Sequence, residues 1–62
     1  MVQIKIIRND TKLIERDVNE WLHSLSLVRD HSFQIMDIKF DHINELDKDV
    51  VMIIYNVVKN TT

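Results

Sequence analysis

The stretch Val50-Val51-Met52-Ile53-Ile54-Tyr55-Asn56-Val57-Val58 carries apolar side chains on both parities and decides how the rest of the chain folds. In an extended strand, alternate residues point to opposite sides of a sheet. This segment is therefore apolar on both of its faces. A strand of that kind is covered on both sides, so we expect residues 50–58 to form the middle strand of a sheet.

Two more strands and one helix are expected around this segment. Val2, Ile4 and Ile6 alternate with polar residues, which predicts a strand that ends at residues 8–10. Residues 33–43 alternate as well. Met36, Ile38 and Phe40 share one parity there, and Phe33, Ile35, Asp37, Lys39 and Asp41 share the other. A helix is predicted over residues 11–25, capped by Asp10 or Thr11. Its apolar face is Ile14, Val18, Trp21, Leu22 and Leu25.

The order of elements, β-α-β-β, predicts an α+β fold in a single domain, residues 1–62. A right-handed crossover makes the first two strands parallel, and a hairpin makes the last two antiparallel. The middle strand then pairs antiparallel with both neighbours, in sheet order 1-3-2, with the helix on one face. Because the chain has no glycine or proline, we expect turns built by Asn and Asp, at residues 9–10, 30–32 and 44–49.

The size of the chain predicts association with further copies. A domain of 62 residues buries only about 60% of its unfolded surface, and without cysteine it has no disulfide to compensate. One helix covers one face of the sheet, so an apolar patch should remain on the other. The tail, residues 59–62, is too short and polar to cover that patch. We expect the patch to contain Ile7, Phe33, Ile35 and Ile53.

Charge and composition argue against several classes of function. The net charge is −2 with no cluster of Lys and Arg, whereas nucleic acid polymers are bound by basic surfaces. No apolar run approaches the roughly 18 residues that span a membrane, and the first residues have a strand pattern, so we expect a cytoplasmic protein. His23, His31 and His42 lack the spacing of metal ligands. No nucleophilic triad is present, so the chain is not expected to be an enzyme.

Six residues are candidates for binding a ligand or forming an interface: Lys5, Arg8, Arg29, Asp37, Lys39 and Tyr55. Lys39 lies between Asp37 and Asp41, which favours a charged stripe over an acid–base pair. Tyr55 can stack on a planar group if its row faces the oligomer side. Arg8 and Arg29 belong to opposite ends of the subunit, and across a symmetric interface they would meet to hold a small anion.

Three segments, residues 18–22, 35–40 and 51–55, carry a family resemblance. They read VNEWL, IMDIKF and VMIIY, and they resemble the small sporulation-associated protein family of low-GC Gram-positive bacteria and their phages. The resemblance implies a bacterial or phage cytoplasmic protein without an established activity. The β-α-β-β order also resembles dodecin, a flavin-binding oligomer. Dodecins stack flavin on a tryptophan borne by a strand, whereas Trp21 is on the predicted helix, so no cofactor is expected.

These patterns favour a non-enzymatic homo-oligomeric binding protein. As a phage accessory protein it would sequester a small nucleotide-type ligand of host defence. The alternative is an inhibitor or regulatory module that binds a host protein, for which the acidic turn at residues 45–49 is a suitable surface. A structural role in sporulation is the third option.

Overall fold

The computed structural model describes residues 1–60 and contains three strands and one α-helix. These are β1 (Val2–Asp10), α1 (Ile14–Ser26), β2 (His31–Ile43) and β3 (Lys48–Lys59), with a short 3₁₀ helix, η1 (Asn44–Leu46), between β2 and β3. The sheet order is β1-β3-β2 and both pairings are antiparallel. The predicted α+β class, element order and sheet order are therefore confirmed. Thr61 and Thr62 of the predicted tail lie outside the described residues.

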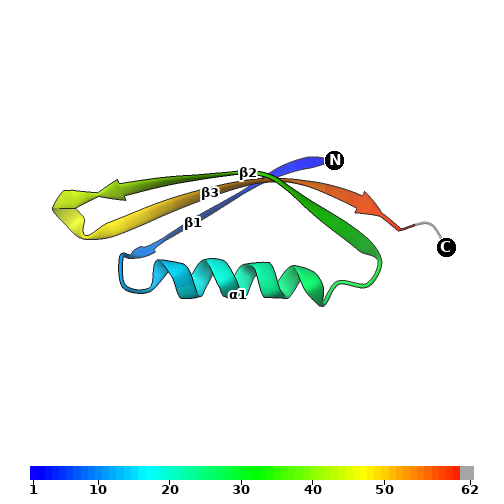
Figure 1. Ribbon diagram of the computed structural model, residues 1–62, viewed down its shortest axis with the longest axis horizontal. Coiled ribbons are helices and arrows are strands. Elements are labelled where there is room, and N and C mark those ends of the chain that lie inside the picture. The colour runs from blue at the N-terminus through cyan, green and yellow to red at the C-terminus, as the bar shows by residue number, and fades with distance from the viewer. Residues whose placement is uncertain (61–62) are drawn as a thin grey trace.

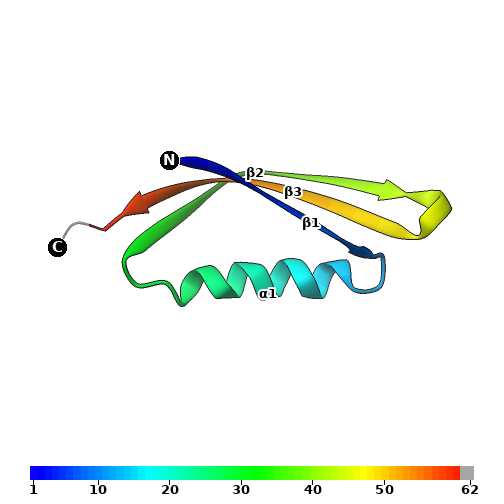
Figure 2. The same cartoon turned by 180° about the vertical axis from the view of Figure 1, so that it is seen from behind.

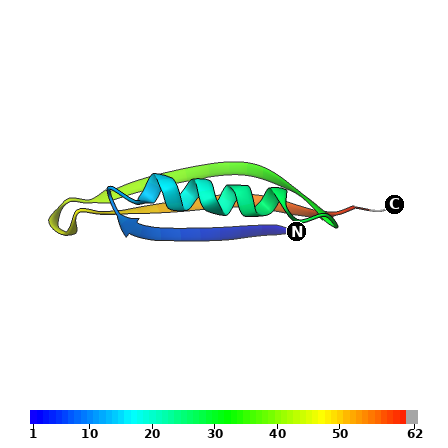
Figure 3. The same ribbon diagram turned by 90° about the horizontal axis from the view of Figure 1, so that it is seen from below.

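The elements form two layers, with the sheet above and α1 below (Figure 1). Seen from behind, no other element of residues 1–60 covers the upper side of the sheet (Figure 2). From below, α1 runs along the sheet between the two edge strands (Figure 3). It packs on β1 and β3. The protein is thus a half-sandwich with one face of its sheet open.

The core lies between α1 and one row of side chains from β3. Burial alternates along β3, so that Val51, Ile53 and Tyr55 are buried, and Ile7 and Ile14 complete the core. Trp21 packs against it with its ring edge-on to Tyr55, at a centroid distance of 5.2 Å. The predicted apolar face of the helix is confirmed for Ile14, which belongs to this core, and for Val18 and Trp21, which pack against it.

A β-bulge in β2 explains an irregularity in the sequence pattern. The register with β3 shifts between Ile35 and Asp37, so Met36 is an extra residue. Ile35 pairs with Tyr55, and beyond the bulge Ile38 pairs with Ile53, which puts both on the side of α1. The uniform alternation predicted for residues 33–43 is therefore wrong. Before the extra residue the odd-numbered positions face α1, and after it the even-numbered positions do.

The turns differ from their predicted boundaries. α1 begins at Ile14 and not at residue 11, after a turn in which the Leu13 N–H donates to the Asp10 carbonyl at 2.8 Å. Neither predicted capping residue caps the helix. The Thr11 hydroxyl donates to Asp49 at 3.2 Å, and the Asp10 carboxylate binds Lys48 at 3.1 Å. In the hairpin, Asp47 adopts the left-handed conformation with φ 49°, a conformation that Asp tolerates. Lys48 and Asp49 already belong to β3.

The shape is extended for a chain of this length. The radius of gyration is 13.4 Å, whereas a compact domain of this length has about 11 Å. The accessible surface is 4952 Å², whereas a folded monomer of this mass exposes about 4,200 Å². The excess of about 750 Å² accompanies the extended shape and the open face of the sheet.

Candidate functional site

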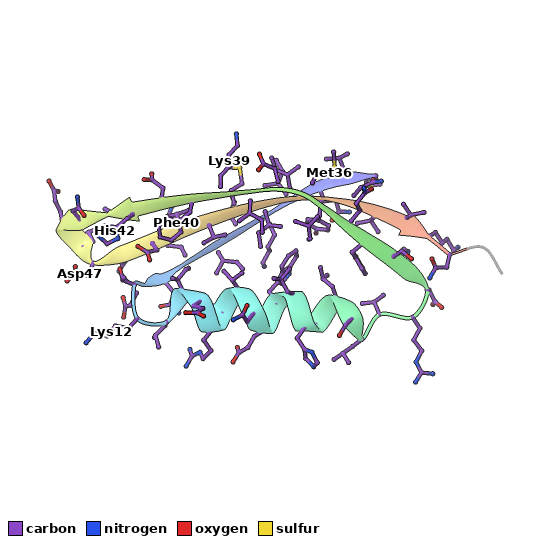
Figure 4. All side chains as sticks on the ribbon, viewed as in Figure 1. Lys12, Met36, Lys39, Phe40, His42 and Asp47 are labelled. Atoms are coloured by element: carbon purple, nitrogen blue, oxygen red, sulfur yellow. The ribbon has the colours of Figure 1, made fainter. Side chains whose placement is uncertain are left out.

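The sheet surface turned away from α1, which we call the outer face, is the most distinctive surface of the molecule. Its apolar part lies mainly on β1 and β3 and consists of Val2, Ile4, Ile6, Met36, Val50, Met52, Ile54 and Val58. The remaining residues of this face are polar and lie mainly on β2: Arg8, Ser32, Gln34, Asp37, Lys39, Asp41 and Asn56. Ile4 is 58% exposed and Met36 is 56% exposed. Met36 and Lys39 point away from α1 (Figure 4). Contiguous exposed apolar surfaces of this kind mark sites of interaction.

The outer face is not made of the residues predicted for the apolar patch. Ile7 and Ile53 are buried beneath α1, and Phe33 packs against the same core. Ile35 also lies on the side of α1, since it pairs with Tyr55. An apolar patch on the far side of the sheet is present as expected, but its composition was predicted wrongly. The sequence alone left both faces of β3 apolar and did not decide which one the helix covers.

The structure brings two of the predicted basic residues into one hollow of the outer face. Arg8 and Lys39 line a depression of about 370 Å³, together with Phe40, Asp41, Ile43, Val50 and Met52. Asp41 lies in the same row as Arg8, because both pair with Val50. Asp37 is one row away from Lys39, opposite Ile54. The hollow therefore has two cationic side chains and one carboxylate.

The other three candidate ligand residues lie elsewhere. Arg29 is in the loop before β2, where its carbonyl accepts a hydrogen bond from Asn60 at 3.3 Å. This is the opposite end of the sheet from Arg8, as predicted. Lys5 and Tyr55 lie on the side of α1. Tyr55 is buried, and its hydroxyl donates to the Gln3 side chain at 3.0 Å. Tyr55 is thus a core residue and not an exposed stacking platform.

A polar cluster that the sequence analysis did not anticipate closes one end of the core. Asp49 is only 2% exposed and accepts a hydrogen bond from the Thr11 hydroxyl at 3.2 Å. Its carboxylate also contacts the His42 ring nitrogen Nδ1. A buried charge needs such partners. The sequence contains one signal for this burial: Asp49 has the same parity as Val51, Ile53 and Tyr55, so it shares their face of the strand.

This cluster has the residue types of a catalytic triad but not the order of contacts. In a triad the hydroxyl bonds to histidine, and histidine bonds to the carboxylate. Here the hydroxyl of Thr11 and the ring of His42 both contact the Asp49 carboxylate. The arrangement satisfies a buried acid and joins the β1–α1 turn to the hairpin.

Asp17 in α1 is an acidic group whose pKa is shifted by its neighbours. The side-chain amide of Asn9 donates a hydrogen bond to its carboxylate. This bond and the neighbouring Arg16, at 3.3 Å, hold the pKa of Asp17 below its ordinary value. The pair ties the end of β1 to the first turn of α1.

Two features are absent from residues 1–60. They contain no group of three or more His, Cys, Asp or Glu arranged to hold a metal ion. No helix within the described range is long and apolar enough to cross a membrane.

The comparisons with known proteins add no identification. No protein-family model, curated protein or solved structure matches the chain. The resemblances to the sporulation-associated family and to dodecin stay predictions, and a functional assignment depends on the geometry of the outer face.

Proposed function

We propose that this chain is a non-enzymatic binding protein that works as a homo-oligomer, with the outer face as its main contact surface. The single observation that carries the proposal is the apolar row Val50, Met52 and Ile54 of β3 on that face, with Val2, Ile4 and Ile6 of β1 beside it. Water covers these side chains in an isolated chain. Burying them is favourable by about 25 cal/mol for each Å².

The available area is sufficient for a stable pair. A standard interface buries about 800 Å² on each partner, and the excess surface of this chain is of similar size. Two identical faces related by a two-fold axis satisfy each other without a further partner. Sheets that pack in this way lie about 10 Å apart with their side chains interleaved. The outer face then becomes the second half of a sandwich core.

Native mass spectrometry of the freshly purified protein tests the proposal. We expect a multiple of the 7.4 kDa chain mass. Ile4→Lys places a charge in the outer face at an exposed position, so the monomer should still fold while the number of subunits falls by half or more. Leu27→Lys is the matched control, because Leu27 is an exposed aliphatic residue at the end of α1, and it should leave the assembly intact.

Two results would contradict the proposal. The first is a wild-type protein that is monomeric at micromolar concentration. The second is an Ile4→Lys variant that folds, by circular dichroism, and keeps the subunit count of the wild type.

A small anionic ligand is the second candidate, and the hollow lined by Arg8 and Lys39 favours it. Two cationic side chains offer the donors that a phosphate group accepts. The ligand would be of the nucleotide type, as expected for a phage accessory protein that sequesters a signal of host defence in the cytoplasm. The volume, about 370 Å³, is in the range of small-molecule sites.

Absorbance and mass of the purified assembly test this second candidate. A bound nucleotide gives excess absorbance at 260 nm and a mass that disappears on denaturation. Arg8→Ser should reduce the bound fraction, whereas Arg29→Ser, at the other end of the sheet, should not. If the wild type carries no ligand and adenosine and guanosine phosphates do not change its melting temperature, the hollow is not a nucleotide site.

A further inference from the structure

The edge formed by β2 leaves a second apolar surface open, on the same side of the sheet as α1. Ile38 is 50% exposed and Phe40 is 62% exposed, because α1 packs over β1 and β3. Between α1 and β2 runs a groove of about 240 Å³. It is lined by Ile14, Glu15, Val18, Asn19, Ile38, Phe40 and Val51. This groove opens on the other side of the sheet from the outer face, and Phe40, at the edge, lines both the groove and the hollow.

The backbone of β2 beyond the bulge is suited to pairing. β2 is at the edge of the sheet, and residues 37–43 pair with β3 in an unbroken register. Their outward backbone groups have no strand partner within residues 1–60. Natural edges are protected by charged side chains that point inward. The other edge, β1, has Lys5 on the side of α1, whereas β2 presents Ile38 and Phe40 there.

We propose that residues 37–43 of β2 pair antiparallel with the same segment of a second copy of this chain, about a two-fold axis at Phe40. The two three-stranded sheets would then form one sheet of six strands. The strand that pairs with this edge belongs to a second copy of the chain. The reason is that the charges of the segment are complementary to those of the same segment running in the opposite direction. Asp37, Lys39 and Asp41 alternate in sign along the outer row.

The charges and the bulge select the register. With the axis at Phe40, each Lys39 lies opposite the partner's Asp41. This gives two ion pairs across the strands. With the axis at Lys39, two lysines would face each other. With the axis at Ile38, Phe40 would meet Met36, where the bulge interrupts the ladder. The axis at Phe40 is the register without repulsion or interruption.

The same register closes the groove. The two Phe40 side chains become direct neighbours on the side of α1, at the spacing of cross-strand pairs. The two grooves then join across the axis into one apolar space. Since the outer face is on the opposite side of the sheet, both contacts can form together, and two such interfaces would close an assembly of four chains.

Single-cysteine variants test the pairing directly, because the chain has no cysteine of its own. Residues opposite each other in an antiparallel pair have Cα atoms about 4.5–5.5 Å apart, which a disulfide can span. Phe40 is exposed, so Phe40→Cys should fold. On mild oxidation we expect this variant to form a covalent dimer at least tenfold faster than Ile38→Cys, Lys39→Cys or the distant control Leu27→Cys.

Charge exchange gives an independent readout in the uncrosslinked protein. Lys39→Asp alone should weaken the edge contact about tenfold, since it places two like-charged pairs across the strands. The double variant Lys39→Asp with Asp41→Lys should restore the affinity. The same Phe40→Cys crosslink in the Ile4→Lys background separates this proposal from the outer-face contact, because it should form even when outer-face packing is lost.

Specific results would overturn the edge pairing. One is a Phe40→Cys protein that crosslinks no faster than Leu27→Cys, which is also the result expected if a peptide or another protein occupies the edge. Another is faster crosslinking at Ile38 or Lys39, which would refute the register. Failure of the double charge exchange to restore affinity would refute the ion pairs.

Discussion

At the scale of single residues, the buried Asp49 stabilises the end of the molecule at the hairpin between β2 and β3. Its carboxylate is buried and held by Thr11 and His42. Removal of such a group leaves its donors unsatisfied, at a cost of about 1–3 kcal/mol. We therefore expect Asp49→Ala to lower the free energy of unfolding by that amount, measured by urea denaturation at fixed protein concentration.

Asp30→Ala is the control for that measurement. Asp30 is an exposed residue of the loop before β2, so its replacement should change stability by less than about 0.5 kcal/mol. Equal losses for Asp30→Ala and Asp49→Ala would contradict the structural role of Asp49.

The hydrogen bond between Asn9 and Asp17 predicts a dependence on pH. A lowered pKa means that the folded state favours the ionised carboxylate. The contribution is complete above about pH 4, where an unfolded aspartate ionises, and it is lost as the pH falls through the pKa of Asp17. Asn9→Ala removes the first cause of the shift, so the pKa of Asp17 should rise toward its ordinary value.

A carboxyl NMR titration measures this pKa in both proteins. Asn19→Ala is the matched control, because Asn19 is an exposed asparagine of α1, and it should leave the titration of Asp17 unchanged. If Asn9→Ala also leaves it unchanged, Arg16 and not Asn9 would be the dominant cause.

At the scale of elements, the bulge in β2 decides which side chains the two faces of the sheet present. Residues 33 and 35 lie toward α1, and after the extra residue so do residues 38 and 40. Deletion of Met36 would restore regular alternation without moving any of these side chains to the other face. A deletion inside a regular strand would instead move every side chain on one side of the deletion to the opposite face of the sheet.

We therefore expect the protein without Met36 to fold, with an unfolding free energy within about 1–2 kcal/mol of the wild type. Amide hydrogen exchange should show protection that continues through residues 35–38. Deletion of Lys39, within the regular part of β2, is the control and should abolish folding. Loss of the fold on deletion of Met36 would contradict the assignment of the bulge.

The sequence was sufficient to predict the elements and their order. The doubly apolar segment at residues 50–58 required a middle strand, and the single helical period at residues 14–25 required one covering helix. Boundaries were less accurate. Thr11 bonds to Asp49, which is distant in sequence, so local capping preferences did not determine where α1 begins.

The face of the sheet that binds could not be predicted from periodicity. Both rows of β3 are apolar, and the choice between them depends on tertiary contacts: the packing of Trp21 on Tyr55 and the partners of Tyr55 and Asp49. In β2 the slip from Phe33 and Ile35 to Ile38 and Phe40 was visible in the sequence. Such a slip of one residue between two apolar alternations is the pattern of a bulge, and it would have placed Phe33 and Ile35 on the same side as Phe40.

At the scale of the whole molecule, the proposal follows from an imbalance between surface and size. A two-layer chain of 62 residues exposes 4952 Å² and leaves the apolar outer rows of β1 and β3 uncovered. Packing of two outer faces against each other would bury this excess exposed surface. Folding and association are then coupled, so the melting temperature should rise with protein concentration. A tenfold dilution that leaves the melting temperature unchanged would indicate a self-sufficient monomer.

An isotope-filtered NMR experiment on mixed subunits shows whether the outer faces pack on each other. Half of the chains carry labelled methionine methyl groups and the other half are unlabelled. Met36 and Met52 lie on the outer face, so their methyl groups should show intermolecular contacts with Ile4, Ile6 or Ile54. Absence of any contact between subunits from these methyl groups, in a sample whose chains exchange freely, would contradict the account.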